Sequence, residues 1–185
     1  MDVPLAFTSR ANYTILLQHL WRVHSSYEAL CSAFDWRPLG IDFDSRRRSR
    51  WLAEDLALLE AMPSEENAPL PAIGTIEHAL GALYVLEGSS LGGQILLREA
   101  LKLPGISVTH GAQFLHGYGP KTRAYWNSFL EALDRFPPDG GAAFAIEQGA
   151  METFQQFNIA LNDRTRVHEL TSGIVEKNRF LEILP

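Results

Sequence analysis

Glycines and serines interrupt a stretch of the chain that otherwise has the apolar pattern of a buried helix. They fall inside Leu83–Leu97 and comprise Gly88, Ser89, Ser90, Gly92 and Gly93. Each glycine costs a helix interior about 1 kcal/mol relative to alanine, and a whole domain is stable by only about 5–15 kcal/mol. Some other interaction must offset this cost.

Three interactions could offset the cost of the glycines. A neighbouring helix could pack closely against Gly88 and Gly92, which lie four residues apart on one helix face. The helix could bend at an interface. A flat ligand could rest on the bare backbone, where any side chain would push it away. The pattern differs from the phosphate-binding glycine fingerprint, which lies between a strand and the start of a helix.

Histidines and a cysteine are the other candidates for chemistry. His19 and His24 lie five residues apart on the first predicted helix, so they point in directions about 140° apart and at most one faces a given pocket. We predict that His24 is a core histidine with one hydrogen bond and that Cys31, on the apolar stripe, is a small core residue. The remaining histidines are predicted at the surface: His78, His110, His116 and His168.

A basic cluster consists of Arg46, Arg47, Arg48 and Arg50. Such a cluster is usually a solvated face. Its position early in a helix is unfavourable for the helix dipole, which suggests contact with an acidic partner. The sequence holds no recognisable nucleophile triad, phosphate-binding loop or metal-ligand spacing.

The elements that carry these residues are all helical. Steps of three and four between apolar residues, with caps and breakers, predict five helices and a weak terminal turn. Their ranges are 9–34, 44–62, 75–102, 120–134, 142–162 and 176–184, with Thr8 or Ser9, Asp44 and Asp139 as caps. No set of alternating strands is present, which predicts an all-α bundle in a single domain, residues 1–185.

Composition excludes several classes of protein. With 185 residues the chain is long enough for one domain with its own core, and a single cysteine excludes a disulfide framework. A net charge of −6 argues against general nucleic-acid binding. No apolar run reaches about 18 residues, and no leader pattern is present. We therefore expect a cytoplasmic protein that does not span a membrane.

The stretch Leu80–Gln94 resembles the distal helix of the heme oxygenase family, most closely that of bacterial members that make biliverdin for bacteriophytochromes. The similarity extends over most of residues 10–165 and includes 44–59, 114–133 and 149–161. It implies an all-α fold that holds heme between two helices. It also implies oxidation of heme, at once substrate and cofactor, to biliverdin, iron and carbon monoxide, with electrons from a reductase.

The resemblance implies roles for individual residues. Gly88, Gly92 and Gly93 would lie against the heme face, and Gly88 and Ser89 would shape the catalytic side. Ser89 takes a position where many members have a carboxylate that organises water, and serine holds no negative charge. Arg123 would pair with a heme propionate, and Phe154 would line the pocket wall.

One departure from the family pattern concerns the iron ligand. The family's proximal histidine lies on a helix that precedes the segment similar to 13–30, and none of the twelve residues before Tyr13 is histidine. We expect the first helix to be lacking and leave the metal ligand unknown. The alternative is a non-catalytic relative that binds a tetrapyrrole or a partner. A weaker alternative is an enzyme with another substrate, such as thiamine, for which Cys31 is a poor nucleophile. Apolar surface left by the lost helix would favour a homodimer.

Overall fold

The computed structural model of the chain describes residues 5–64, 68, 70, 72–136 and 140–162. In these residues the secondary structure is helical, with no strand and only an isolated bridge pairing near Ser107. The predicted all-α fold is confirmed. The longer helices are α1 (Arg10–Cys31), α3 (Ser49–Leu58), α4 (Ile76–Ala100), α6 (Thr122–Asp134) and α7 (Gly140–Asn162). The shorter ones are η1 (Leu5–Phe7), η2 (Arg37–Leu39), α2 (Phe43–Arg46), α5 (Gln113–His116) and η3 (Gly119–Lys121).

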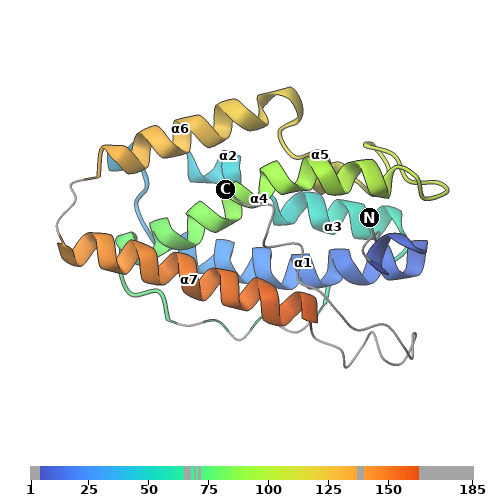
Figure 1. Cartoon of the computed structure of the whole chain (residues 1–185), viewed down its shortest axis with the longest axis horizontal. Helices are drawn as coiled ribbons and strands as arrows, with labels where there is room; N and C mark the ends of the chain where they lie inside the picture. Colours follow the sequence, from blue (N-terminus) through green and yellow to red (C-terminus); the bar gives the residue numbers. More distant parts are fainter. Residues whose placement is uncertain (1–4, 65–67, 69, 71, 137–139, 163–185) are drawn as a thin grey trace.

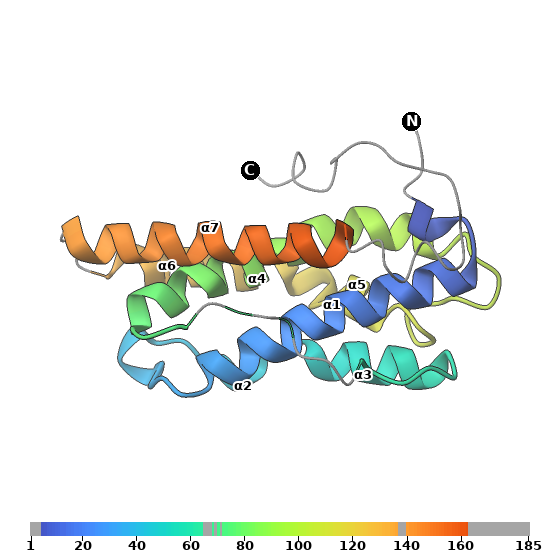
Figure 2. The same ribbon diagram turned by 90° about the horizontal axis from the view of Figure 1, so that it is seen from below.

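Helix α4 is the central element of the bundle. It packs most extensively on α7 and also contacts α1, α5 and α6, while α1 packs on α3 and α7 (Figure 1). Figure 2 shows α7 and α3 on opposite sides of α1. The α4 face towards the core carries apolar residues with little or no exposed surface, including Leu80, Leu83 and Val85. Residues of α4 are therefore held by helices on several sides.

Two helices start where the sequence predicts them, because each capping hydrogen bond joins residues only three positions apart. The Ser9 hydroxyl accepts a hydrogen bond from the Asn12 amide at 3.1 Å, and Thr75 caps α4 through the His78 amide at 3.3 Å. A side-chain oxygen of this kind satisfies one of the free amides in a first helical turn. Helix α1 ends at Cys31 rather than Phe34, and the Trp36 indole donates to the Cys31 carbonyl at 2.8 Å.

The prediction of one helix over 44–62 is wrong. The segment forms two helices, α2 and α3, separated at Arg47, whose backbone is extended. Asp42, not Asp44, caps α2, since its carboxylate accepts from the Ser45 amide at 3.3 Å. The break arises because a distant carboxylate, described below, binds the first amides of α3 and gives it a new start.

The remaining boundaries differ by a few residues. Pro120 lies in the short η3, so α6 begins at Thr122, and α7 begins two residues before the predicted Ala142. Asp139, the predicted cap of α7, and the predicted turn over 176–184 lie outside the described residues. Among the described helices, α4 alone is long and apolar enough to span a membrane, and 67% of the tested window is buried inside the protein. Helix α4 is thus a core helix.

Candidate functional site

The glycines of α4 differ in what surrounds them. At Gly81 a Cβ would collide with the backbone of α7 at Ile146, and at Gly149 it would collide with the His78 carbonyl of α4. These two glycines allow α4 and α7 to cross closely. Gly93 faces α5, with the Leu115 carbonyl 3.2 Å from an added Cβ. At Gly92 an added Cβ would meet no atom within 4 Å.

Gly92 therefore lies beside open space in the middle of a core helix. Helix packing, one of the three interactions that could offset the glycines, explains Gly81 and Gly149 but not Gly92. The glycines do not break the helix, since α4 is continuous from Ile76 to Ala100. Gly88, one turn before Gly92, is buried. Bare backbone beside open space is what a flat ligand needs.

The hydroxyl of Ser89 is held in a triangle of hydrogen bonds. It donates to the Leu86 carbonyl at 2.7 Å, and it accepts from the Arg48 guanidinium at 2.7 Å. The same Arg48 nitrogen also donates to the Leu86 carbonyl. Ser89 is half-buried, whereas Arg48 is only 2% exposed. A buried guanidinium thus reaches the glycine segment of α4 from a different part of the chain.

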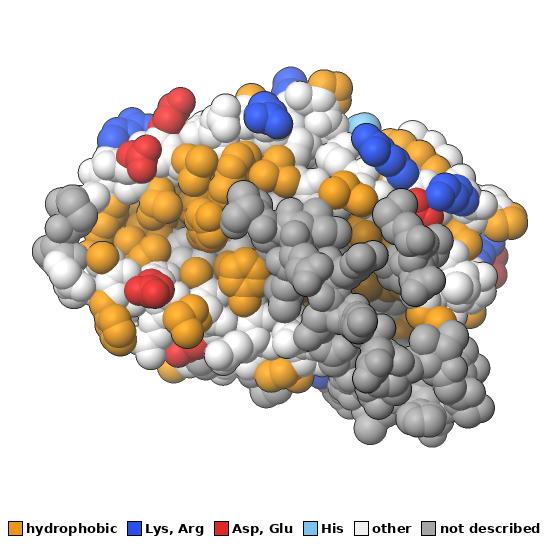
Figure 3. Space-filling model, viewed as in Figure 1, with side chains coloured by type: hydrophobic (Ala, Val, Ile, Leu, Met, Phe, Trp, Pro, Cys, Tyr) orange, Lys and Arg blue, Asp and Glu red, His pale blue; other side chains and the backbone are white. Residues whose placement is uncertain are grey.

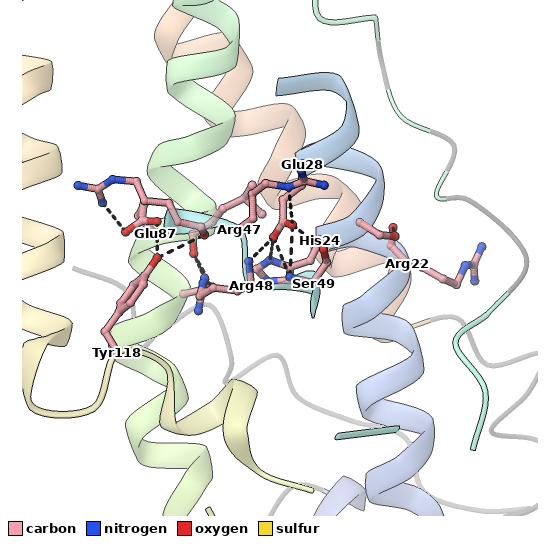
Figure 4. Close-up of polar contacts among 12 residues, drawn as sticks. Arg22, His24, Glu28, Arg47, Arg48, Ser49, Glu87 and Tyr118 are labelled. Carbon is pink, nitrogen blue, oxygen red and sulfur yellow. Dashed lines mark hydrogen bonds and ion pairs between the residues drawn. The ribbon is translucent and has the colours of Figure 1, made fainter. Parts of the chain in front are cut away.

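Glu28 of α1 fixes the position of Arg48. Its carboxylate accepts from the backbone amides of Arg48 and Ser49 at 2.8 and 3.0 Å and from the Ser49 hydroxyl at 2.5 Å (Figure 4). Burial raises the pKa of Glu28, but the contacts with His24, Ser49 and the Arg48 amide outweigh burial, and the net pKa is lowered. A charged carboxylate at the start of α3 also suits the helix dipole.

A buried ion pair between Arg46 and Glu87 lies beside these contacts. Arg46 donates to Glu87 at 2.9 Å, and the Tyr118 hydroxyl donates to the other Glu87 oxygen at 2.9 Å (Figure 4). Arg46 also donates to the Tyr125 carbonyl and the Ser128 hydroxyl. Burial raises the pKa of Glu87 against the pull of Arg48 and Arg46. The pair ties α2, α4 and the segment before α6 together.

These contacts correct the interpretation of the basic cluster. Arg46 and Arg48 point into the protein, and Arg47 is half-exposed near Glu28 and Asp44. The carboxylates that receive them, Glu28 and Glu87, were not identified from the sequence. A signal did exist: Glu87 stands in the apolar run of α4, and a carboxylate buried there needs a charged partner.

Two site residues implied by the resemblance lie on other helices. Arg123 is exposed on the first turn of α6, and Phe154 is half-buried on α7, packed against the core. Gly88, Ser89, Gly92 and Gly93 share one segment of α4 by sequence alone. The α4 segment is therefore the part of the site that the contacts define.

The histidines of α1 are both buried and have different neighbours. The His19 Nδ1 atom bonds the Ala160 carbonyl, and the His24 ring lies edge-on to Phe114 and Phe157. Helix α1 is covered by α3 and α7 as well as α4, so residues in different directions are enclosed. The core placement of His24 is confirmed.

The single hydrogen bond expected for His24 is absent. Neither ring nitrogen has a hydrogen-bond partner, and the nearest carboxylate oxygen, of Glu28, is 3.7 Å from Nδ1. The surface prediction for His78 is also wrong, since its Nε2 pairs with Glu152 across the α4–α7 crossing at 2.9 Å. Cys31 is fully buried as predicted, and burial raises the pKa of its thiol to about 12.

His24 should make stability fall at low pH. Burial, with the nearby Arg48 charge, lowers its pKa to about 4 from an ordinary 6.5. Between these values the unfolded chain binds a proton that the folded chain does not, so acid favours unfolding. We expect wild type to lose up to about 3 kcal/mol between pH 7 and pH 4 relative to His24→Phe.

Urea unfolding of both proteins at several pH values measures this difference. Asp55, whose pKa burial raises to about 6, acts in the opposite direction, because its stability contribution falls as pH rises from about 4 to 6. Asp55 is present in both proteins, so its contribution cancels in the comparison. Parallel stability curves for wild type and His24→Phe would contradict the assignment of His24.

Comparison with known proteins identifies the family. The heme oxygenase family model matches residues 5–163. A heme oxygenase of Xanthomonas campestris pv. campestris (strain 8004) is 29% identical over 157 residues, which cover 83% of this chain and 91% of that protein. The crystal structure of NO- and CO-bound heme oxygenase from Neisseria meningitidis superposes with a TM-score of 0.77 at 25% identity, covering 86% of this chain and 79% of that one. The chain belongs to the heme oxygenase family.

Proposed function

We propose that this chain binds heme as its substrate against the backbone of α4 at Gly92 and oxidises it to biliverdin, iron and carbon monoxide. The observation that carries the proposal is the open space beside Gly92 on α4. A flat macrocycle needs an apolar surface without side chains, and the open space beside Gly92 offers it; Gly88, one turn away and buried, would border it. Heme itself supplies the oxygen chemistry, and the chain supplies binding and orientation.

Neighbouring residues complete the proposed site. Ser89 offers a hydroxyl at the edge of the bare backbone. Arg123 is exposed on α6, and its guanidinium is suited to a propionate through a charge-assisted hydrogen bond. Phe154 would supply apolar wall from α7. Gly93 serves the contact of α4 with α5 and thereby fixes the helix rather than touching the ligand.

We assign the iron to none of His19, His24 and His78. His24 is enclosed by Phe114 and Phe157, while His19 and His78 are bonded to Ala160 and Glu152. The hemin complex should therefore respond to added imidazole, which supplies a nitrogen ligand.

Hemin titration followed by turnover tests the function. We expect a Soret band that saturates at one hemin per chain, sharpens with imidazole, and gives way to biliverdin when a reductant and air are supplied. Saturation without biliverdin would favour the non-catalytic, tetrapyrrole-binding alternative. A titration in which hemin shows no bound spectrum would contradict heme binding altogether.

The resemblance also suggests where the protein acts and with what. We propose a cytoplasmic enzyme that receives electrons from a reductase and passes biliverdin to a bacteriophytochrome. A homodimer is supported by apolar surface: hydrophobic side chains gather over α6 and α7 in Figure 3, and α7 exposes Phe144, Met151 and Ile159 by 64, 55 and 56%. Light scattering at micromolar concentration distinguishes dimer from monomer.

A further inference from the structure

We infer that Arg48 is a positioning residue that makes Ser89 a hydrogen-bond acceptor towards the ligand. The inference rests on the proposed function and concerns the same α4 segment. It depends on three contacts already described: Arg48 to Ser89, Arg48 to Leu86, and Ser89 to Leu86. Arg48 lies 41 residues from Ser89 in sequence, so nothing local links them.

A serine hydroxyl can form only a few hydrogen bonds, so each of its partners can be counted. Serine has one proton to donate and two lone pairs to accept with. The Ser89 proton is given to the Leu86 carbonyl, and one lone pair receives the Arg48 guanidinium. One lone pair is left. A ligand or water that reaches Ser89 must therefore donate a hydrogen bond to it.

Arg48 is held firmly enough to impose this arrangement. Its backbone amide is bound by Glu28 at 2.8 Å, and its guanidinium lies 5.1 Å from the centre of the Phe114 ring. A guanidinium stays charged and has no acceptor, so it can only donate to Ser89. A residue that rotated or lost its proton could not fix the direction of the hydroxyl in this way.

The consequence concerns water bound to ferric heme iron. Such water can donate a hydrogen bond, and an acceptor beside it stabilises water over hydroxide. Ser89 held as an acceptor should therefore raise the pKa of the bound water. A hydrogen bond of ordinary strength corresponds to about 0.5–1 pKa unit.

The test is a double-mutant cycle on the ferric hemin complex, with the acid–alkaline transition of the Soret band as the readout. Ser89→Ala should lower the pKa of the bound water by about 0.5 unit or more in the wild-type background. In the Arg48→Lys background, where the planar fork is lost but the charge is kept, the same substitution should have less than about half that effect. Comparing Ser89→Ala within each background cancels the direct effect of the Arg48 substitution.

Ser90→Ala is the matched control. The Ser90 hydroxyl bonds the Glu87 carbonyl at 2.6 Å, the same local pattern as Ser89. It should leave the pKa of the bound water unchanged in both backgrounds. If Arg48→Lys does not fold, Arg48→Met takes its place in the cycle.

The outcomes separate the two proposals. An equal Ser89→Ala effect in both backgrounds, or none in wild type, would overturn the positioning role of Arg48 while heme binding stands. A wild-type chain without a hemin spectrum would overturn the proposed function and this inference with it. A reduced effect in the Arg48 background supports both.

Discussion

Replacing Gly81 with alanine should destabilise the protein by about 3 kcal/mol or more, although alanine is the better helix former. The new Cβ would collide with the Ile146 carbonyl and lie 2.7 Å from the Ala150 amide nitrogen. Both are backbone atoms of a helix and cannot rotate away, so α4 and α7 must separate. Separation opens the largest helix contact of the bundle. For a domain of this size the loss corresponds to a melting temperature lower by on the order of 10 °C.

Gly92→Ala is the control for Gly81→Ala, because the chemical change is identical and the surroundings differ. No atom lies within 4 Å of an added Cβ at Gly92, so only helix propensity changes. We expect stability to rise by about 0.5–1 kcal/mol. Thermal unfolding of wild type and the two variants measures these changes in stability. Equal losses of stability in both variants would show that Gly92 also packs against a neighbouring helix.

Glu87→Gln should cost about 3–5 kcal/mol, because it leaves a buried guanidinium without its counter-charge. Glu87 is 1% exposed at its side chain and Arg46 is 7% exposed, so water cannot replace the lost carboxylate. Glutamine keeps the shape but also offers an amide nitrogen that cannot accept from Arg46 or Tyr118. Urea unfolding measures the cost.

Two further variants distinguish a lost charge pair from lost packing. Replacing both partners, Arg46→Met with Glu87→Met, should recover part of the stability, since the Arg46 charge is removed while the buried Arg48 charge, which also acts on Glu87, stays. Lys102→Ala removes an exposed pair with Glu99 and should cost less than about 0.5 kcal/mol. A double variant as unstable as Glu87→Gln alone would indicate that packing, rather than charge, dominates at this position.

How well the sequence predicts each feature depends on how far apart in the sequence the interacting residues lie. The cap at Ser9, one of the two residues expected there with Thr8, was predicted because a cap bonds an amide three residues away. The break between α2 and α3 was missed because Glu28, about 20 residues earlier, binds the amides that start α3. No local pattern at 44–62 contains that information.

The candidate site was likewise predicted only in part. The unusual glycine segment of α4 was found from composition and spacing alone. Which glycines serve packing and which faces open space depends on where α7 crosses α4, and the helical glycines Gly81 and Gly92 look alike in sequence. The burial of Arg46 and Arg48 likewise depends on Glu87 and on the Leu86–Ser89 pair, which join the site only through the fold.

Hemin titration of wild type beside Gly92→Leu tests the central claim most directly. Leucine should fit into the space beside α4 without loss of folding, and it should occupy the surface on which the macrocycle rests. We predict one-to-one hemin binding in wild type and binding at least about tenfold weaker in Gly92→Leu, a difference of about 1.4 kcal/mol. Equal hemin affinity in two equally folded proteins would contradict the claim that the bare backbone at Gly92 is the heme surface.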